Sequence, residues 1–466
     1  MALQSKKMTR PSSNQKANHD IFIISLGCPR NLVDTEVLVG TLKRKGFRVF
    51  FDSERLRKSK TPGIAIVNTC GFIKDAKEES IGVILELAAL KKEGRLGHII
   101  IMGCLSQRYP EGLAKDIREI DAIFGSSTFT RIPEYIEGIL KGQKKTLVDE
   151  VPGFLYNHKS PRSLLTPSHT AYVKIQEGCM NFCSYCVIPK IRGPFRSRSR
   201  ESVLKEISSL KARGVKEINL IGQDTTLYGI DKRGKSTLAA LLKEASQIMK
   251  SRWIRLLYTH PAHYSEDLIK TIAEEPAVCK YLDLPIQHIN DRILKSMNRR
   301  TAKKDIIALI KNLRKNIPGL AIRTSVIVGF PGEREEDFNE LEEFIKNTKF
   351  ERLGAFTYSP EEGTRAFSMP GHVPEEEKNR RLERIMETQK KISEDYNKLY
   401  LKETVKVLID EKDREGKNRY LGRTAHDAPE VDGTVYVTSK GGLRPGDFVN
   451  VKIGDTLEYD LVGSQI

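Results

Sequence analysis

Short apolar runs alternate with longer amphipathic stretches along the first third of the chain. The runs IFIISLG, GIAIVNT, HIIIMG and IDAIFG are rich in β-branched residues, which favours strands buried on both faces. Helical patterns follow these runs at 31–45, 75–93 and around 110–119. Strands that alternate with helices predict a parallel α/β sheet.

The same alternation continues through about 165–370, in six strand–helix units. The strands are expected at AYVKIQ, EINLIG, RLLYTH, YLDLPI, AIRTSVIVG and RLGAFTYS, with helices such as 202–213, 237–250 and 333–346. Six units favour an open, partial (β/α)6 barrel over the closed eight-stranded form. A charged stretch after Pro374, with apolar residues at helical spacing, predicts a connecting helix.

The pattern changes to short β runs from Lys402 onward. Five such runs, separated by Gly and Asp, predict a small OB-like β barrel. The fold class is therefore α/β with a small all-β domain at the end. The expected bounds are a disordered tail at 1–18, then domains at 19–140, 165–396 and 399–466.

The charge balance first suggests a nucleic-acid partner. The 466 residues carry 78 Lys and Arg against 61 Asp and Glu, a formal net charge of +17. Residues 402–466, however, hold 10 basic and 12 acidic residues. An RNA-binding barrel is expected to be basic, so a basic protein partner fits better, and nucleic acid is not expected as the substrate. A barrel that only packs on the body is the alternative.

The chain shows no apolar run of about 20 residues and no apolar segment of a secretory signal near Met1. We therefore expect a cytoplasmic protein that does not interact with membranes. Clustered cysteines in such a protein indicate metal or redox chemistry more often than disulfides. Of the seven cysteines, Cys279 stands alone and is interpreted as a small buried apolar residue.

Three cysteines, Cys28, Cys70 and Cys104, each follow one of the N-terminal apolar runs. Because parallel strands end at the same edge of a sheet, these thiols can converge although they are far apart in sequence. Three unrelated buried thiols are the alternative. With no nearby His, the set favours an iron–sulfur cluster with one open iron over a closed zinc site.

The other three cysteines, Cys179, Cys183 and Cys186, have the spacing C-x3-C-x2-C directly after the strand AYVKIQ. This spacing matches neither a zinc knuckle nor a bacterial ferredoxin run. It resembles the loop of the radical S-adenosylmethionine (SAM) superfamily. In that superfamily the three cysteines hold a 4Fe-4S cluster, and the fourth iron binds the amino and carboxylate groups of SAM.

Several residues after the predicted barrel strands are candidates for the SAM pocket. The resemblance implies that Tyr185, just before the last cysteine, packs near the adenine. Gly329 and Gly332 let the backbone approach a ligand closely. We expect SAM to be bound by Tyr185, Gln223, Gly329 and Gly332, with loop packing as the alternative for each. The further polar residues at strand ends are Asp224, His260, Gln287, His288 and Tyr358, and no catalytic residue is identified beyond the cluster ligands.

The pair His260 and His263 suggests a metal site, but we interpret it as part of a Pro-containing loop.

The order of the three parts resembles the methylthiotransferase family of radical SAM enzymes from about 19 to 466. The motifs SLGCPRNLVDTE, LIGQDTTLYG, FTYSPEEGT and GRTAHDAPEVDG are similar to the members that modify an aspartate of small-subunit ribosomal protein twelve. The tRNA-modifying members read nearer to GQNVNSYG and YSPRPGT. The resemblance implies a methylthiotransferase N-terminal domain, a radical SAM core and a TRAM domain.

The resemblance also implies the chemistry. One 4Fe-4S cluster, on Cys179, Cys183 and Cys186, cleaves SAM to a radical that removes hydrogen from the unactivated β-carbon of the aspartate. A second 4Fe-4S cluster, on the N-terminal cysteines, offers sulfur, and a second SAM molecule supplies the methyl group. An electron donor such as flavodoxin or ferredoxin is implied, and we expect a monomer.

Three interpretations stay open at this point. The basic residues Lys190, Arg192, Arg196, Arg198 and Arg200 are either a solvated loop or an attraction for the carboxylate of the target aspartate or of SAM. The chain as a whole is alternatively a tRNA adenosine methylthiotransferase with the same chemistry. It is otherwise a non-catalytic metal-containing RNA-binding protein, which predicts no SAM cleavage.

Overall fold

A computed structural model describes residues 20–51, 56, 62–414, 416 and 418–466. The tail expected at 1–18 lies outside these residues. The chain forms two compact units, which are described one at a time: unit 1 comprises 1–150 with 160–163, and unit 2 comprises 151–159 with 164–466. Among the described residues, no helix combines the length and apolar character that a membrane crossing requires.

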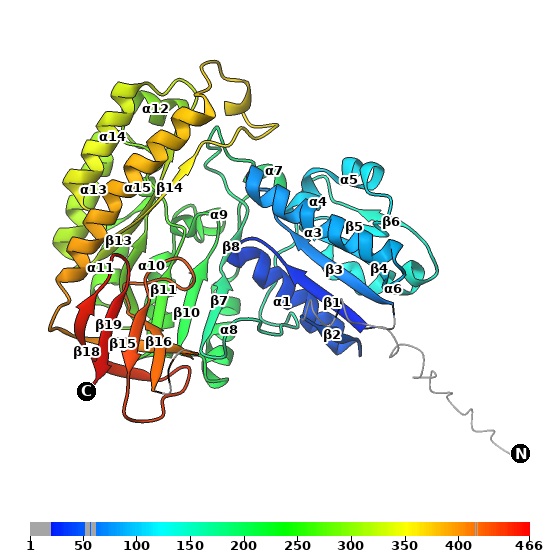
Figure 1. The fold of residues 1–466 in the computed structure, drawn as a ribbon, viewed down its shortest axis with the longest axis horizontal. Coiled ribbons are helices and arrows are strands. Elements are labelled where there is room, and N and C mark those ends of the chain that lie inside the picture. The colour runs from blue at the N-terminus through cyan, green and yellow to red at the C-terminus, as the bar shows by residue number, and fades with distance from the viewer. Residues whose placement is uncertain (1–19, 52–55, 57–61, 415, 417) are drawn as a thin grey trace, which may run out of the picture. The chain divides into compact units, whose positions relative to one another are not determined.

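Unit 1 contains a six-stranded sheet in the order β2-β1-β3-β4-β5-β6, and every neighbouring pair is parallel. This confirms the predicted parallel α/β sheet. The strands are β1 (Asp20–Ser25), β2 (Arg48–Phe50), β3 (Gly63–Thr69), β4 (Leu96–Gly103), β5 (Ala122–Phe124) and β6 (Lys145–Leu147). The helices are α1 (Pro29–Arg44), α3 (Lys74–Lys92), α4 (Cys104–Arg108), α5 (Pro110–Asp116) and α6 (Ile132–Leu140), with the 3-10 turn η1 (Phe129–Arg131). Figure 1 shows these elements in blue and cyan.

The centre of this sheet is buried on both faces, as the apolar runs predict. Every residue of β3 is buried, and Ala65, Val67, Ile99 and Ile101 pack into one hydrophobic cluster with residues of α3. Helices cover a strand that carries no polar alternation, because neither of its faces meets water. The edge strands β2 and β6 were not predicted, since each contributes only three residues.

Unit 2 begins with an open six-stranded parallel sheet in the order β14-β13-β12-β11-β10-β7. The predicted partial (β/α)6 barrel is therefore confirmed. The strands are β7 (Thr170–Lys174), β10 (Glu217–Ile221), β11 (Trp253–Leu256), β12 (Val278–Asp283), β13 (Ala321–Val328) and β14 (Arg352–Thr357), and the short pair β8 (Gln176–Glu177) and β9 (Arg196–Ser197) lies between β7 and β10 in the chain.

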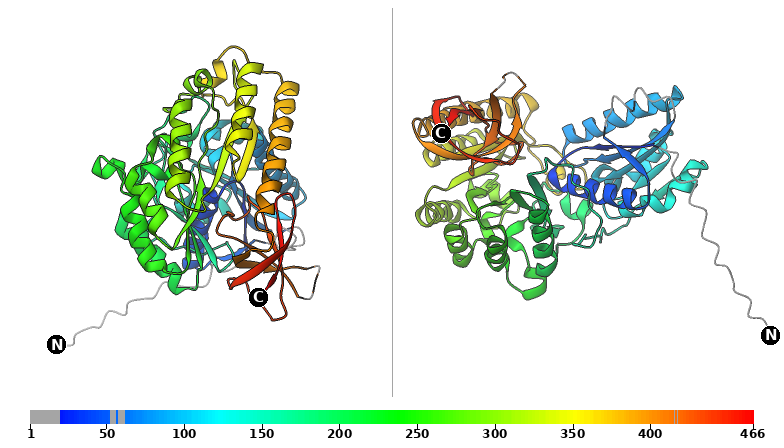
Figure 2. Two further views of the ribbon diagram at one scale, coloured as in Figure 1. Left: turned by 90° about the vertical axis from the view of Figure 1, so that its left-hand side faces the viewer. Right: turned by 90° about the horizontal axis from the view of Figure 1, so that it is seen from below.

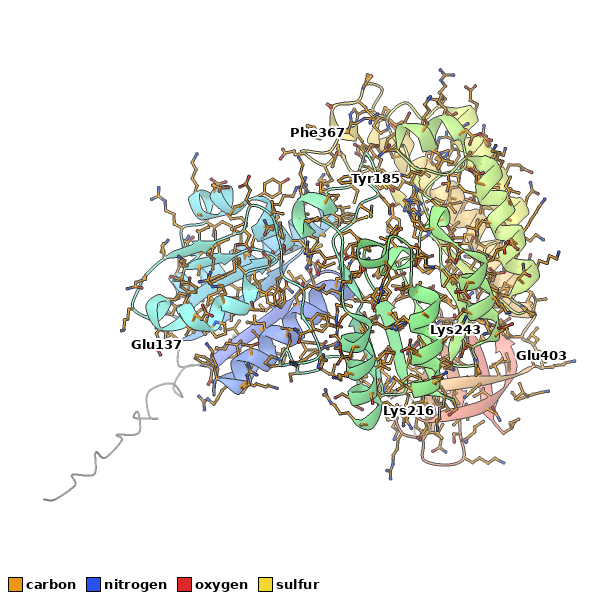
Figure 3. The ribbon with its side chains drawn as sticks, turned by 180° about the vertical axis from the view of Figure 1, so that it is seen from behind. Glu137, Tyr185, Lys216, Lys243, Phe367 and Glu403 are labelled. Carbon is orange, nitrogen blue, oxygen red and sulfur yellow. The ribbon has the colours of Figure 1, made fainter. Side chains whose placement is uncertain are left out.

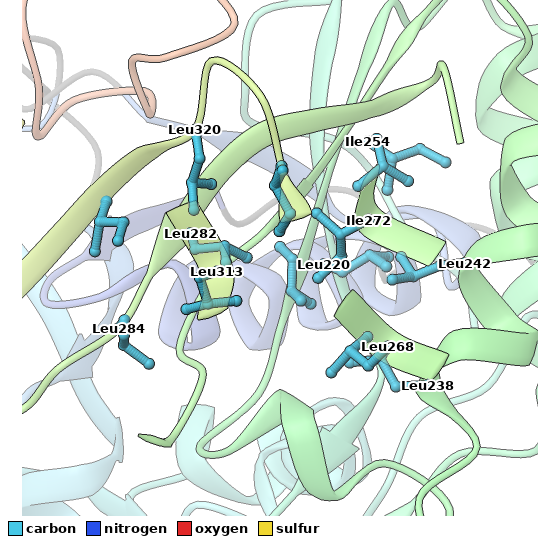
Figure 4. Packing of buried hydrophobic residues seen from close by; sticks show 14 of the residues in the cluster. Leu220, Leu238, Leu242, Ile254, Leu268, Ile272, Leu282, Leu284, Leu313 and Leu320 are labelled. Atoms are coloured by element: carbon cyan, nitrogen blue, oxygen red, sulfur yellow. The ribbon is translucent and has the colours of Figure 1, made fainter. Parts of the chain in front are cut away.

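Helices follow or separate these strands along the chain. They are α7 (Ile188–Arg192), α8 (Arg200–Ala212), α9 (Ile230–Arg233), α10 (Leu238–Met249), α11 (Glu266–Glu274), α12 (Asp291–Ser296), α13 (Lys303–Asn316), α14 (Glu335–Thr348) and α15 (Glu375–Lys398), with the 3-10 turns η2 (Thr225–Leu227), η3 (Pro261–His263) and η4 (Ala366–Ser368). The strand residues Leu220, Ile254 and Leu282 meet Leu242 and Leu313 of the helices in the core of unit 2 (Figure 4). Cys279 is 4% exposed, which confirms its interpretation as a buried residue.

The last part of unit 2 is a closed five-stranded barrel in the order β15-β16-β17-β19-β18. The strands are β15 (Thr404–Lys412), β16 (Arg419–Arg423), β17 (Val435–Thr438), β18 (Phe448–Thr456) and β19 (Leu461–Gln465). Figure 2 shows them in orange and red, wrapped around a small core of its own. The predicted β barrel is confirmed.

The junction between this barrel and the open sheet is built from buried ion pairs. Glu217 of β10 pairs with Arg255 at 3.0 Å and with Arg423 of the small barrel at 2.8 Å. Asp427 accepts from Arg352 at 2.7 Å, and Asp432 accepts from the Tyr281 hydroxyl at 2.6 Å.

This junction changes the interpretation of the charge. Asp427 and Asp432 belong to the acidic excess that favoured a basic partner. Both, however, form ion pairs inside unit 2, with Arg352 and Arg323 respectively. The small barrel therefore carries less acidic charge on its surface than its composition indicates.

Candidate active site

The three N-terminal cysteines lie at the carboxyl ends of neighbouring strands. Cys28 caps the start of α1 just after β1, Cys70 follows β3, and Cys104 opens α4 after β4. Gly27 brings the first loop close to the second: its φ is +84°, and a Cβ there would lie 3.2 Å from Cys70 Sγ. A larger residue would push these two loops apart.

Asn31 ties the three loops together, a role that the sequence alone did not indicate. Its Nδ2 donates to the carbonyl oxygens of Leu26 at 3.2 Å and Thr69 at 3.1 Å. Its Oδ1 accepts from Cys104 Sγ at 3.4 Å. One buried amide thus contacts the segments that carry all three cysteines. The position of Asn31, three residues after Cys28, was the only sequence signal for it.

The surroundings of Cys70 disfavour a negative charge in the bare protein. Burial, with the nearby Cys104 and Cys28, raises the pKa of this thiol to about 12, although the Phe72 backbone N–H and Arg30 oppose the increase. These effects also show that the three thiols are close enough to interact. A cationic metal centre is the group that would stabilise them as thiolates.

The second cysteine set occupies one loop between β8 and α7. Gly178, just before Cys179, has a φ of +78°, and a Cβ there would lie 2.1 Å from the Pro194 carbonyl oxygen. The loop is fixed to the segment after α12: Ser184 Oγ donates to the Ser296 oxygen at 2.8 Å, and Asn298 Nδ2 donates to the Phe182 oxygen at 2.8 Å.

A buried polar network holds the same loop from the β10 side. Asn181 Nδ2 donates to Asp224 Oδ2 at 2.7 Å, and Asn181 Oδ1 lies 3.0 Å from His263 Nε2. The other oxygen of Asp224 accepts from the Thr226 hydroxyl and from the Thr226 backbone N–H at 3.1 Å. Asn181 stands between two cysteines of the motif, so this network sets the path of the cluster loop.

Among the described residues, Asp224, His260 and His263 are the group whose ligand atoms lie within 4.8 Å of one another, close enough for a single metal ion. Hydrogen bonds already occupy both oxygens of Asp224 and the Nε2 of His263. His260 caps the turn η3, where its Nδ1 accepts from the Ala262 N–H at 3.1 Å. This arrangement agrees with the interpretation of the pair as part of a Pro-containing loop.

Arg299 places a positive charge beside the cluster loop. Its Nη1 lies 3.8 Å from Cys183 Sγ, and its Nη2 donates to the Pro285 oxygen at 2.6 Å. Burial raises the pKa of Cys179 to about 11, with Asp224 and Cys183 adding to it and hydrogen bonds from Asn181 opposing it. Nothing in the sequence pattern pointed to Arg299, because it lies more than 100 residues from the motif that it contacts.

Tyr185 packs against the aromatic residue of the predicted glycine segment. Its ring lies edge-on to Phe330, with centroids 6.5 Å apart, and Phe330 in turn contacts Tyr358 at 5.3 Å. Figure 3 shows Tyr185 toward the end of unit 2 that lies opposite Lys216, the residue just before β10. Tyr185 therefore lies near the carboxyl ends of the strands, where barrel sites form.

The predicted glycines have internal packing roles. Gly329 has a φ of +74°, and a Cβ there would lie 2.3 Å from Lys378 Cγ of α15. Gly332 has a φ of +79°, and its N–H donates to the Gly371 oxygen at 2.7 Å. Both positions thus need glycine for reasons within the fold. Their contact with SAM stays a prediction.

Gln223 belongs to a buried charged cluster. Its Nε2 donates to Glu177 Oε1, and Lys174 Nζ donates to Glu177 Oε2 at 2.6 Å. Burial by itself would raise the pKa of Glu177, but Lys174 and Arg192 outweigh burial and lower it to about 2. The Gln223 Oε1 atom is buried and has no hydrogen-bond partner among the described residues, so it remains available to a bound ligand.

The basic stretch is only partly solvated. Lys190 and Arg200 are exposed and Arg196 is half-buried, but Arg192 and Arg198 are each 3% exposed. Arg198 donates to Glu206 Oε2 at 2.5 Å and stacks over the Tyr156 ring at 4.2 Å. The interpretation as a solvated loop is therefore wrong for Arg192 and Arg198, because local carboxylates draw their guanidinium groups inward.

Comparisons with known proteins match all three of the domains described above. Family models match the radical SAM superfamily at 173–345, the uncharacterized protein family UPF0004 at 20–125, and the TRAM domain at 403–466. A relative from Pelotomaculum thermopropionicum is 47% identical over 446 residues, covering 96% of this chain and 99% of its own. One from Clostridioides difficile is 46% identical over 443 residues, covering 95% and 98%. Both are named ribosomal protein uS12 methylthiotransferase RimO.

The chain belongs to this family. It is a radical SAM methylthiotransferase, and the cofactors of the family are SAM and 4Fe-4S clusters. The donor sets fit those clusters, because each unit gathers three cysteine thiols, the ligand type that iron–sulfur clusters use. In the part of the chain that the structure describes, the three sulfur atoms of neither set all lie within 4.8 Å of one another, the spacing that a single metal ion would need.

Solved structures of other radical SAM enzymes share the fold. The methyltransferase TsrM from Kitasatospora setae, solved with tryptophan and a SAM analogue, superimposes with a TM-score of 0.52 at 16% identity, covering 73% of each chain. The cobalamin-dependent enzyme OxsB gives a TM-score of 0.51 at 13% identity, covering 79% of this chain and 56% of its own. At these identities the likeness shows the fold alone.

Proposed function

We propose that this protein adds a methylthio group to the β-carbon of an aspartate in ribosomal protein uS12. The observation that carries the proposal is the presence of two three-cysteine sets, one at the carboxyl ends of three parallel strands and one in the loop between β8 and α7. The choice of uS12 is supported by relatives of that name, which are 46–47% identical over nearly the full length. The acidic charge of the small barrel is weaker support for uS12, because Asp427 and Asp432 are paired at the junction with the open sheet.

Each cysteine set receives one cluster in this proposal. Cys179, Cys183 and Cys186 hold the cluster that binds SAM, and Cys28, Cys70 and Cys104 hold the second. When bound, these groups supply one-electron cleavage of SAM and a sulfur atom for insertion at carbon. The domains proposed at 19–140, 165–396 and 399–466 then correspond to sulfur supply, SAM chemistry and the TRAM barrel.

The chain's own residues position these groups. Asn181 and Arg299 hold the cluster loop through hydrogen bonds, and the Arg299 guanidinium offsets the negative charge of the Cys183 thiolate. Tyr185, Gln223, Gly329 and Gly332 form the proposed SAM pocket, where Gln223 Oε1 accepts from a SAM donor. Arg192 lies 3.8 Å from Glu177, which Lys174 already contacts at 2.6 Å, so these three side chains carry one net positive charge that would favour a nearby carboxylate of the substrate or of SAM.

The remaining parts of the proposal concern partners. An electron donor such as flavodoxin or ferredoxin supplies the reducing electron. A uS12 substrate implies a cytoplasmic location, and we propose that the enzyme acts as a monomer.

Purified enzyme with reconstituted clusters tests the proposal when it is assayed on both uS12 and tRNA with SAM and dithionite. The expected product is methylthiolated aspartate, detected by mass spectrometry of uS12 peptides. Methylthiolation of tRNA adenosine without modification of uS12 would refute the substrate. SAM cleavage absent with both substrates, in enzyme that has its full iron content, would refute the reaction class.

A further inference from the structure

A cavity of about 920 Å³ lies in unit 2, outside the open sheet. Residues from the start of α8, the region of α9 and the α10 helix line it. The charged residues that matter here are Arg200, Glu201, Lys232, Arg233, Lys235 and Glu244. None of them belongs to the cysteine loop or to the proposed SAM pocket.

Three of these charges are left without a partner. Arg200 pairs with Glu244 at 3.1 Å, and Glu201 pairs with Lys205 at 2.5 Å. Lys232, Arg233 and Lys235 are all exposed, and their side chains make no hydrogen bond or ion pair within the described ranges. Three like charges over four residues repel one another, so an anionic partner would lower their energy.

The segment that carries these cations has a fixed geometry. Gly229 and Gly234 bracket α9 in the left-handed region, at φ values of +88° and +69°. The Gly229 N–H donates to Ser197 Oγ at 2.8 Å, and the Ser197 N–H donates to Asp231 Oδ2 at 3.0 Å. The segment that carries the three cations is therefore hydrogen-bonded to β9 at both Gly229 and Asp231.

The same contacts connect the cavity to the cluster loop. Ser197 of β9 pairs with Gln176 of β8, and Cys179 follows Gln176 by three residues. The wall of the cavity thus touches the strand that leads directly into the cysteine motif.

We propose that this cavity is the docking site of an acidic electron-carrier protein. The inference rests on the proposed function, since each SAM cleaved by reduction consumes one electron from outside. Carboxylates of the carrier pair with Lys232, Arg233 and Lys235, which steers the encounter to the side of unit 2 next to the cluster loop. The lining also holds Glu201 and Glu244, each in an ion pair, so its charge is mixed and not uniformly basic, which favours a protein with separate carboxylates over the continuous phosphates of RNA.

The test compares two triple variants of the holoenzyme. The variant K232E/R233E/K235E reverses the unpaired charges. The control K304E/K311E/K315E reverses three exposed lysines of α13 that likewise make no ion pair in the described chain. Formation of 5′-deoxyadenosine is measured with reduced flavodoxin and its NADPH-dependent reductase, and separately with dithionite, which needs no docking site.

We expect the first variant to need about tenfold or more flavodoxin for half-maximal rate at low salt, and to match the wild type with dithionite. The control variant should match the wild type with both reductants. Direct binding is the second readout: the affinity for oxidised flavodoxin, from microscale thermophoresis, should fall by a similar factor only in the first variant.

Equal rates of all three proteins with flavodoxin would overturn the docking site. An equal loss with dithionite would also overturn it, because the variant would then have damaged the cluster. Lost binding to a labelled RNA duplex with unchanged flavodoxin affinity would assign the cavity to RNA. Failure of the wild type to modify uS12 with dithionite refutes the proposed function alone, since flavodoxin binding is measured independently of it.

Discussion

The two cysteine sets reach similar chemistry by opposite routes. Cys179, Cys183 and Cys186 lie within eight residues of one loop, while Cys28, Cys70 and Cys104 depend on three strands of a parallel sheet. The first set is held by side chains from distant segments, such as Asp224 and Arg299. The second is held by side chains of the same unit, such as Asn31 and Ser80, next to the ends of the sheet strands.

This difference has a physical reason. A loop has no regular backbone hydrogen bonds of its own, so other parts of the fold must fix its path. Strand ends are already fixed by the sheet, and side chains such as Asn31 and Ser80 join the segments that follow them. The compact motif therefore depends on side chains from other segments to fix its loop, and the dispersed motif depends on the hydrogen bonding of the sheet.

The largest effect is expected from Cys179→Ala. Loss of a ligand to the proposed SAM-binding cluster should reduce SAM cleavage and methylthio transfer to background. Chromatography with mass spectrometry measures 5′-deoxyadenosine and modified uS12 in the same sample. The matched control is Cys279→Ala, which removes a buried thiol that belongs to neither set and should leave both products intact. Cleavage that persists in the Cys179 variant would contradict the assignment.

Cys70→Ala should separate the two sets. SAM cleavage continues in this variant, while methylthio transfer stops, because the SAM-binding loop keeps all three ligands. Iron analysis of the reconstituted variant should show about half the iron of the wild type, as expected on losing one of two 4Fe-4S clusters. If this variant still transfers a methylthio group, the second cluster is wrongly placed.

Removal of the residues that hold each set should give intermediate effects. Asn181→Ala should lower SAM cleavage by about 10- to 100-fold, the usual cost of losing a group that orients metal ligands. Asn31→Ala should instead lower methylthio transfer and spare SAM cleavage. Electron paramagnetic resonance of the reduced SAM-binding cluster should change only in the Asn181 variant. If both substitutions lowered SAM cleavage and methylthio transfer to the same extent, Asn31 and Asn181 would not act on separate cysteine sets.

A substitution at the junction with the small barrel should affect the activity of the two cysteine sets least, and should instead lower the free energy of unfolding. Glu217→Gln leaves Arg423 and Arg255 short of a buried partner, which should destabilise unit 2 by about 3–5 kcal/mol. Urea unfolding at neutral pH measures this loss. The exposed Glu335→Gln, a partner of Arg380, is the control and should cost about 1 kcal/mol or less.

The pH dependence of the same variant follows from the pKa of Glu217. Burial raises this pKa, but Arg423 and Arg255 outweigh burial and lower it from 4.5 to about 2. The carboxylate therefore contributes stability above pH 4.5, and that contribution is lost as the pH falls toward 2. Glu217→Gln should flatten the stability profile in that window, and an unchanged profile would contradict the ion-pair assignment.

The sequence was sufficient for the fold class and for most of the sheet strands, because buried strands leave strong local patterns; it also singled out both cysteine sets by their spacing, and their role as cluster ligands stays a prediction. It was insufficient for Asn31 and Arg299, since a hydrogen bond across the fold leaves no periodic signal. The sequence composition also overstated the acidic charge on the surface of the small barrel. Asp427 and Asp432 count as acidic surface in a composition, and only their contacts with Arg352 and Tyr281 show that they are internal.

The most direct test of the central claim is mass spectrometry of ribosomal protein uS12 from cells with and without this protein. The account predicts a methylthio group on one aspartate of uS12 in cells that contain the protein, and an unmodified aspartate in cells that lack it. An identical uS12 in both, with a methylthio group that disappears from tRNA adenosine instead, would contradict it.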